Sequence, residues 1–156
     1  MVHIQLTTEI AAPIERCFDL SRSIDLHLES VDWSGEQAIA GVTTGLIGTG
    51  EEVTWRGRHF GFMITHTSRI TAFQSPVYFQ DAMMRGAFRS YCHDHHFETR
   101  GTNTLMRDDV KLAAPLGILG IIAEKTLLER HMRVLLQRRN VAIKQAAEST
   151  EWKKFL

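Results

Sequence analysis

The spacing of apolar residues changes along the chain, and each change marks a predicted element. Residues 2–10 alternate, with Ile4 and Ile10 on the same side, which is typical of a half-buried strand. Pro13 then fits the first position of a short helix. Ser23 is suited to cap a second short helix, because its hydroxyl can accept a hydrogen bond from a free backbone N–H.

Repeated alternation over residues 51–113 predicts a run of strands. Short turns separate the patterns, and such close spacing favours an antiparallel meander. The predicted strands are 51–56, 60–70, 77–83, 88–99 and 104–112. The preceding segment, 31–50, suggests at most one short strand near 37–40. Its glycines fit either turns or the hinge of a loop over a pocket mouth.

A helical pattern from about residue 118 to residue 147 ends the domain. A helix of about thirty residues would be about 45 Å long and needs a large apolar surface to lie against. Its apolar stripe is predicted to contain Leu128, Met132 and Leu135, widened by Leu127, Val134 and Val141. We expect one domain over residues 1–148 and a loose tail over 149–156, in which Trp152 and Phe155 are the residues able to pack.

Composition narrows the classes of function. The 18 Lys and Arg residues balance the 18 Asp and Glu residues, which argues against nucleic acid as a partner. The longest apolar stretch, 116–123, is too short to span a bilayer, so we expect no stable membrane insertion. The two cysteines form no disulfide framework, and no signal peptide is apparent, which makes the cytoplasm the expected location.

Four segments resemble the START-like superfamily, also called SRPBCC. They are AAPIERCFDL at 11–20, GEEVTWR at 50–56, VYFQD at 77–81 and MRDDV at 106–110, and the resemblance covers nearly the whole chain. It implies an α+β helix-grip fold, in which a curved antiparallel sheet of about seven strands wraps around a long C-terminal helix, with two short helices after the first strand. The most similar subgroup consists of bacterial ligand-binding or polyketide cyclase/dehydrase-like proteins.

The same resemblance implies a cavity between the sheet and the helix. Strand parity and helix spacing predict which apolar side chains face it: Trp55, Phe60, Phe62, Ile64, Phe79, Met83, Tyr91, Met106, Leu128, Met132 and Leu135. Walls rich in aromatic residues and methionine suit an adaptable apolar ligand. The alternative is that these side chains simply pack on one another.

Polar residues with the same parity carry the candidate chemistry. His66, Asp81, His93, His95 and Asp108 are all predicted to point inward, where they need partners. A histidine beside a carboxylate could act as a general acid or base, so His93, His95, Asp81 and Asp108 are the candidate catalytic residues. His93 and His95 could also bind a metal with Asp108 or Asp81, but the spacing is more typical of two hydrogen-bonded histidines.

Three functions are compatible with these patterns. The first is binding of a small hydrophobic or amphipathic molecule, such as a lipid, a polyketide-like compound or an aromatic compound. The second is a polyketide cyclase or dehydratase that uses a His and an Asp in the same cavity. The third is a partner-binding module with a filled core. His27 and Glu29 lie near the expected entrance, and we predict neither a metal nor an organic cofactor.

Overall fold

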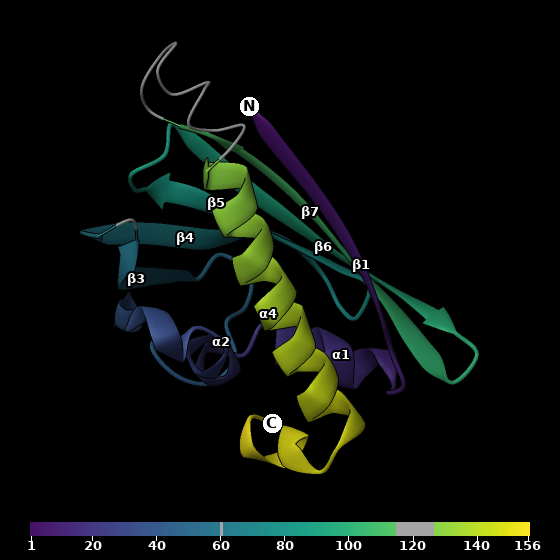
Figure 1. Ribbon diagram of the computed structural model, residues 1–156. Coiled ribbons are helices and arrows are strands. Elements are labelled where there is room, and N and C mark those ends of the chain that lie inside the picture. Colours follow the sequence, from purple (N-terminus) through teal and green to yellow (C-terminus); the bar gives the residue numbers. More distant parts are fainter. Residues whose placement is uncertain (60, 115–126) are drawn as a thin grey trace.

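The computed structural model describes residues 1–59, 61–114 and 127–156, and its elements follow the predicted order (Figure 1). Phe60 and the predicted start of the long helix, 118–126, lie outside the described residues. The elements are β1 (Val2–Ile10), α1 (Ile14–Ser21), α2 (Ile24–Ser30), the 3₁₀ helix η1 (Asp32–Ser34), β2 (Gln37–Gly41), β3 (Glu52–His59), β4 (Phe62–Gln74), β5 (Tyr78–Arg85), β6 (Ser90–Arg100), β7 (Asn103–Ala113), α4 (Glu129–Glu148) and the 3₁₀ helix η3 (Glu151–Lys154).

The strands form one antiparallel sheet in the order β1-β7-β6-β5-β4-β3-β2. The sheet curves around α4, which crosses its face diagonally, while α1 and α2 lie together near the C-terminal end of α4 (Figure 1). This arrangement confirms the predicted helix-grip architecture. It also explains why alternation is so regular, because each long strand buries only one of its faces.

The second short helix begins as the sequence predicts, and the first begins one residue later than predicted, at Ile14. Pro13 occupies the N-cap position of α1 with an extended backbone. The hydroxyl of Ser23 accepts a hydrogen bond of 3.3 Å from the backbone N–H of Leu26, which caps α2. The chain thus turns away from β1 twice within about twenty residues, and both helices contact α4.

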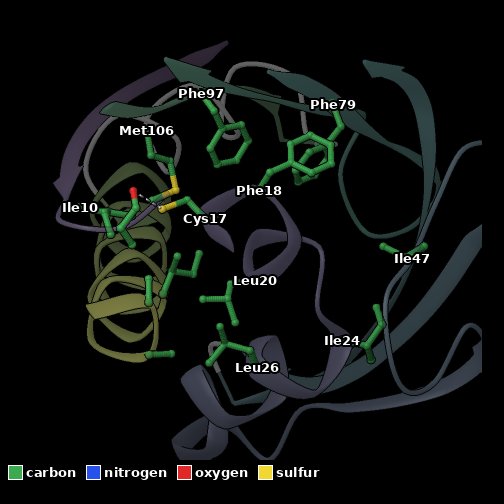
Figure 2. Close-up of a cluster of buried hydrophobic side chains, with 14 of the residues drawn as sticks. Ile10, Cys17, Phe18, Leu20, Ile24, Leu26, Ile47, Phe79, Phe97 and Met106 are labelled. Carbon is green, nitrogen blue, oxygen red and sulfur yellow. Dashed lines mark hydrogen bonds between the residues drawn. The ribbon is translucent and has the colours of Figure 1, made fainter. Parts of the chain in front are cut away.

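One end of the interior is a filled hydrophobic core. Phe18 of α1 lies at its centre and meets the rings of Phe73, Phe79 and Phe97 edge-on, at centroid distances of 5.3, 5.5 and 5.4 Å (Figure 2). Met106 is fully buried in the same cluster. A second cluster joins β1 and β7 to α4 through Val2, Ile4, Val110, Leu112, Leu128 and Leu136.

The buried stripe of α4 differs from the predicted one. Val134 and Val141 are 38% and 52% exposed, because they share the side of the helix that faces solvent, and Leu127, which precedes α4, is 59% exposed. The buried stripe instead continues along the helix from Leu136 to Ala147, and two of its members, Arg139 and Asn140, are polar. Its buried residues are Leu136, Arg139, Asn140, Ile143, Ala146 and Ala147.

Two segments are more tightly held than their composition suggests. Gly41, Gly45 and Gly50 adopt positive φ angles, so they serve as turn residues. The backbone N–H of Gly45 donates to Asp25 of α2 at 2.8 Å, which fixes the glycine-rich segment to that helix. The expectation of a loose tail is wrong, because the tail contains η3 and packs Trp152 and Phe155 against the core.

Candidate functional site

A cavity of about 680 Å³ lies beside the filled core, between α4 and the inner faces of β3 to β6. The second half of the interior has no equivalent of Phe18 among the described residues, so the side chains of sheet and helix leave space between them there. Phe62 and Leu127 line the cavity but are 73% and 59% exposed, which locates its opening to solvent.

Most of the predicted inward-facing residues line this cavity. They are Trp55, Phe62, Ile64, His66, Phe79, Asp81, Tyr91, His93, His95, Leu128, Met132 and Leu135. Three others do not. Met83 follows the last β5–β6 residue pair and lies beside Gly86. Met106 packs in the filled core under α1, and Asp108 lies behind the histidines.

Strand register brings the predicted polar residues together at the inner wall of the cavity. His93 of β6 lies opposite Asp81 of β5, and His95 lies opposite Asp108 of β7. The ring centroids of the two histidines are only 3.6 Å apart, and the His95 ring stacks on Phe79 at 4.0 Å. These four polar residues, with Arg139 and Asn140 of α4, are called the inner cluster below.

Asp108 is the fully buried centre of the inner cluster. Its Oδ1 accepts a hydrogen bond from His93 Nε2 at 2.8 Å, and its Oδ2 accepts one from Asn140 Nδ2 at 2.7 Å. Arg139 Nη1 approaches Oδ1 at 3.5 Å. Burial alone would raise the pKa of this carboxyl group, but its contacts with His93 and His95 and the charge of Arg139 hold the pKa well below its usual range.

Asp81 and His93 have shifted pKa values at the cavity wall itself. His95 Nε2 lies 2.9 Å from Asp81 Oδ2, and this contact and the nearby His93 outweigh burial, lowering the pKa of Asp81 to about 2. Burial, followed by the neighbouring His95 ring, lowers the pKa of His93 to about 4. The inner wall therefore presents an ionised carboxylate beside a neutral imidazole near pH 7.

Arg139 and Asn140 belong to the inner cluster but were not among the predicted site residues. Arg139 is 8% exposed and its Nη2 donates to the carbonyl oxygen of Ser21 at 2.7 Å. A signal was present, because both residues follow Leu136 at helical spacing and precede Ile143 on the same face. Two polar residues inside an apolar stripe indicate a buried partner, which here is Asp108.

A second polar group lies elsewhere on the cavity wall and is called the outer cluster below. Its members are His27, Glu36, His59 and His131. Glu36 accepts hydrogen bonds from His27 Nε2 at 2.7 Å and from His59 Nε2 at 3.3 Å, and His59 lies 3.3 Å from His131. Burial raises the pKa of Glu36, but the two histidines outweigh burial and lower it to about 2. Of the two residues expected near the entrance, His27 lines the cavity and meets Glu36, and Glu29 is exposed.

Solved structures with the same architecture include TTHA0849 from Thermus thermophilus, with 16% identity, a TM-score of 0.73 and coverage of 95% of this chain and 100% of that one. A START superfamily protein from Mycobacterium smegmatis has 12% identity, a TM-score of 0.67 and coverage of 94% and 97%. Ginseng major latex-like protein 151 from Panax ginseng has 14% identity, a TM-score of 0.67 and coverage of 95% and 98%.

The chain therefore has the START-like helix-grip fold, as its sequence motifs predict. No protein-family model matches the sequence, and no curated protein is similar to it at a significant level. Across the described ranges, no helix is both long and apolar enough to cross a membrane.

Proposed function

We propose that this protein binds a small, largely apolar molecule in the cavity between the sheet and α4. The observation that carries this proposal is the cavity of about 680 Å³, whose walls are mainly apolar and whose inner end presents the inner cluster. Its volume falls within the range of about 300–1,000 Å³ that is typical of small-molecule sites. A partner-binding module with a filled core is less well supported, because such a core would leave no comparable space.

The walls suit a ligand with aromatic or branched apolar parts. Met132 and Leu135 approach from α4, and Trp55 and Ile64 approach from the sheet. Flexible Met and Leu side chains adapt to several shapes, while an indole offers a flat surface for stacking. Affinity would come from removing this apolar surface from water, at roughly 25 cal/mol for each Å² buried.

The charges near the cavity favour a neutral ligand over an anionic one, because Arg22 and Arg139 on its wall are already paired with Asp19 and Asp108. Asp81 in the inner cluster and Glu36 in the outer cluster both line the cavity, and the pKa of each carboxyl group is lowered to about 2. An anionic head group beside either carboxylate would be repelled. Hydroxyl groups, in contrast, could donate to Asp81. A hydroxylated aromatic or polyketide-like compound therefore fits better than a fatty acid.

Calorimetric titration with 2-naphthol in buffer containing EDTA tests this proposal. We expect saturable binding of one molecule per chain, and weaker binding of 2-naphthoate, which has the same rings but carries a negative charge. Ile64→Trp should fill part of the cavity and weaken binding of 2-naphthol at least about tenfold, or about 1.4 kcal/mol. Thr65→Trp is the matched control, because Thr65 is the next residue of β4 and is exposed.

The two tryptophan variants separate cavity binding from surface binding. Both should keep the thermal stability of the wild type within a few degrees, since one fills space and the other adds surface. Equal binding of 2-naphthol by both variants would contradict the proposal, as would binding of several molecules per chain without saturation.

A second candidate function is general acid and base catalysis of cyclisation or dehydration. It is favoured by the pair of His95 Nε2 and Asp81 Oδ2, which lie 2.9 Å apart on the cavity wall. Such a pair could remove a proton from a carbon next to a carbonyl group and return it to a departing hydroxyl group as water leaves. Absorbance of a poly-β-ketone substrate would report the conjugated product. If this function is correct, the wild type turns the substrate over, the His95→Gln variant does not, and the His96→Gln variant does so at the wild-type rate.

A further inference from the structure

Three side chains of the inner cluster converge on one point of the cavity wall. Asp81, His93 and His95 each offer one ligand atom, and these atoms lie within 4.8 Å of one another. All three residues line the cavity. They come from the paired strands β5 and β6, so the backbone hydrogen bonds of the sheet fix their relative positions.

The distances are close to those around a tetrahedral metal ion. Asp81 Oδ2 lies 2.9 Å from His95 Nε2 and 3.8 Å from His93 Nδ1. Ligand atoms about 2.1 Å from a zinc ion in tetrahedral geometry would be about 3.4 Å apart. The two observed distances bracket that value, and the ligand atoms of His93 and His95 lie within 4.8 Å of each other, so the two rings must rotate for their nitrogens to converge on one ion.

Asp108 supplies the outer contacts that such a site needs. Metal-bound histidines commonly donate their second ring nitrogen to a carboxylate, which orients the ring. Here His93 Nε2 and His95 Nδ1 both face Asp108 Oδ1, at 2.8 and 3.4 Å. Asn140 holds the other oxygen of Asp108 at 2.7 Å. Each histidine thus points one nitrogen at Asp108 and the other toward Asp81.

Counting ring protons shows why a cation suits this point. Both nitrogens of His95 face carboxylate oxygens, one of Asp81 and one of Asp108. A neutral imidazole has only one N–H, so its other nitrogen would turn a lone pair toward a carboxylate. In the described part of the chain, His95 Nδ1 is a buried nitrogen with no hydrogen-bond partner. A metal ion at Nε2 removes this conflict, because the single N–H can then face Asp108 from Nδ1.

We propose that Asp81, His93 and His95 bind a divalent first-row transition metal ion, with Zn²⁺ as the reference ion, and that Asp108 orients the two histidines. Two imidazoles and one carboxylate are a donor set suited to zinc or iron(II). Three protein ligands leave a coordination position toward the cavity. The proposal reverses the expectation from sequence, because the spacing of His93 and His95 alone does not reveal that Asp81 and Asp108 flank them.

Titration with metal alone tests the site without any organic ligand, so its outcome is independent of the proposed binding function. Tag-free protein is treated with a chelator and dialysed, then titrated with Co²⁺ while absorbance between 500 and 700 nm is recorded. We expect one Co²⁺ per chain, with intense bands that indicate four- or five-fold coordination. Zn²⁺ should displace it stoichiometrically and raise the melting temperature.

Four variants assign the ligands. Asp81→Asn and His95→Gln should each weaken Co²⁺ binding about 100-fold or more, and Asp108→Asn should weaken it about 10- to 100-fold, as expected for an orienting residue. His96→Gln should bind as the wild type does, because His96 is the next residue of β6 and lies on the opposite face against Tyr78. If His95→Gln does not fold, Asp81→Asn decides, since the Asp81 side chain is 20% exposed at the cavity wall.

Two results would overturn the proposal. One is a wild-type protein that binds less than one Co²⁺ per chain at millimolar metal. The other is Co²⁺ binding that survives in both Asp81→Asn and His95→Gln, which would locate the metal elsewhere.

Discussion

The filled end and the cavity end of this interior are built on the same face of β6. Phe97 and Tyr91 both point inward from that strand, yet Phe97 packs around Phe18 while Tyr91 lines the cavity. The difference comes from α1, which contacts β6 and β7 at one end and inserts Phe18 between sheet and helix. Inward-facing aromatic residues therefore form a core or a wall depending on what lies across from them.

The polar residues follow the same division. The filled core contains apolar side chains around Phe18, whereas the cavity wall carries the outer cluster and, from the inner cluster, Asp81, His93, His95 and Arg139. Buried charges are costly unless they are paired. The cavity end of the protein thus keeps groups that a core made only for stability would not contain, which is the pattern expected of a binding or reactive site.

The largest expected effect is at Phe18. Phe18→Ala would open a hole in the filled core and should reduce the free energy of unfolding by about 3–5 kcal/mol. Phe62→Ala should change it by less than about 0.5 kcal/mol, because Phe62 is 73% exposed at the cavity mouth. Urea denaturation of both variants measures the difference. Similar losses in the two would contradict the division of the interior into filled and open ends.

A comparable loss in the free energy of unfolding is expected when Asp108 is replaced. Asp108→Ala removes the acceptor shared by His93 and Asn140 and leaves Arg139 with a buried, unpaired charge. Breaking a buried charge pair in this way should cost about 3–5 kcal/mol. Asp109→Ala is the neighbouring control, since Asp109 lies on the outer face of β7 with His3 and Gln5. Equal stability of the two variants in urea would show that the inner cluster does not support the fold.

The outer cluster should make a smaller, pH-dependent contribution. Glu36 has a pKa lowered from 4.5 to about 2 in the folded protein, so its ionised form is favoured by folding. This stability is complete above pH 4.5 and is lost as pH falls through about 2. Glu36→Gln should therefore cost about 1–3 kcal/mol at about pH 7 and much less at about pH 2.5. A difference between wild type and variant that does not shrink in acid would contradict this role.

The smallest effect concerns the boundary between the two ends. Helix α2 contributes Leu26 to the filled core and Ile24 to the cavity wall, and Ser23 caps it. Ser23→Ala should destabilise the protein by about 1 kcal/mol. Ser23→Thr should retain part of that stability, because a threonine hydroxyl also caps a helix and adds no charge at this buried position. Thermal denaturation of both variants measures these differences. A Ser23→Ala variant with the melting temperature of the wild type would exclude a stabilising cap at Ser23.

Strand parity explains how much of the site the sequence could predict. Alternation on β5 and β6 correctly placed Phe79, Asp81, Tyr91, His93 and His95 on one face. It failed for Met106 because parity gives the face of a strand and not what covers it, and α1 covers that position. Met83 lies one residue beyond the last pair of β5 with β6 and is not among the described residues that line the cavity.

Contacts that tertiary packing makes between distant segments could not be predicted from the sequence. Glu36 reaches His27 and His59 from a segment with no strong pattern, and no local spacing links those three positions. Arg139 is the exception, since a charged residue within a helical apolar stripe stands out in the amino-acid pattern alone. The fold was more predictable than the site because the fold depends on periodicity, whereas the site depends on contacts between distant segments.

The most direct test of ligand binding in the cavity is an NMR experiment on methyl-labelled protein saturated with 2-naphthol. Intermolecular nuclear Overhauser effects report which methyl groups lie within a few ångströms of the ligand rings. We predict such effects to Ile64, Met132 and Leu135 on the cavity wall, and none to Ile10 or Met106 in the filled core. Effects confined to exposed methyl groups such as those of Val141, or no effects at saturation, would contradict the account.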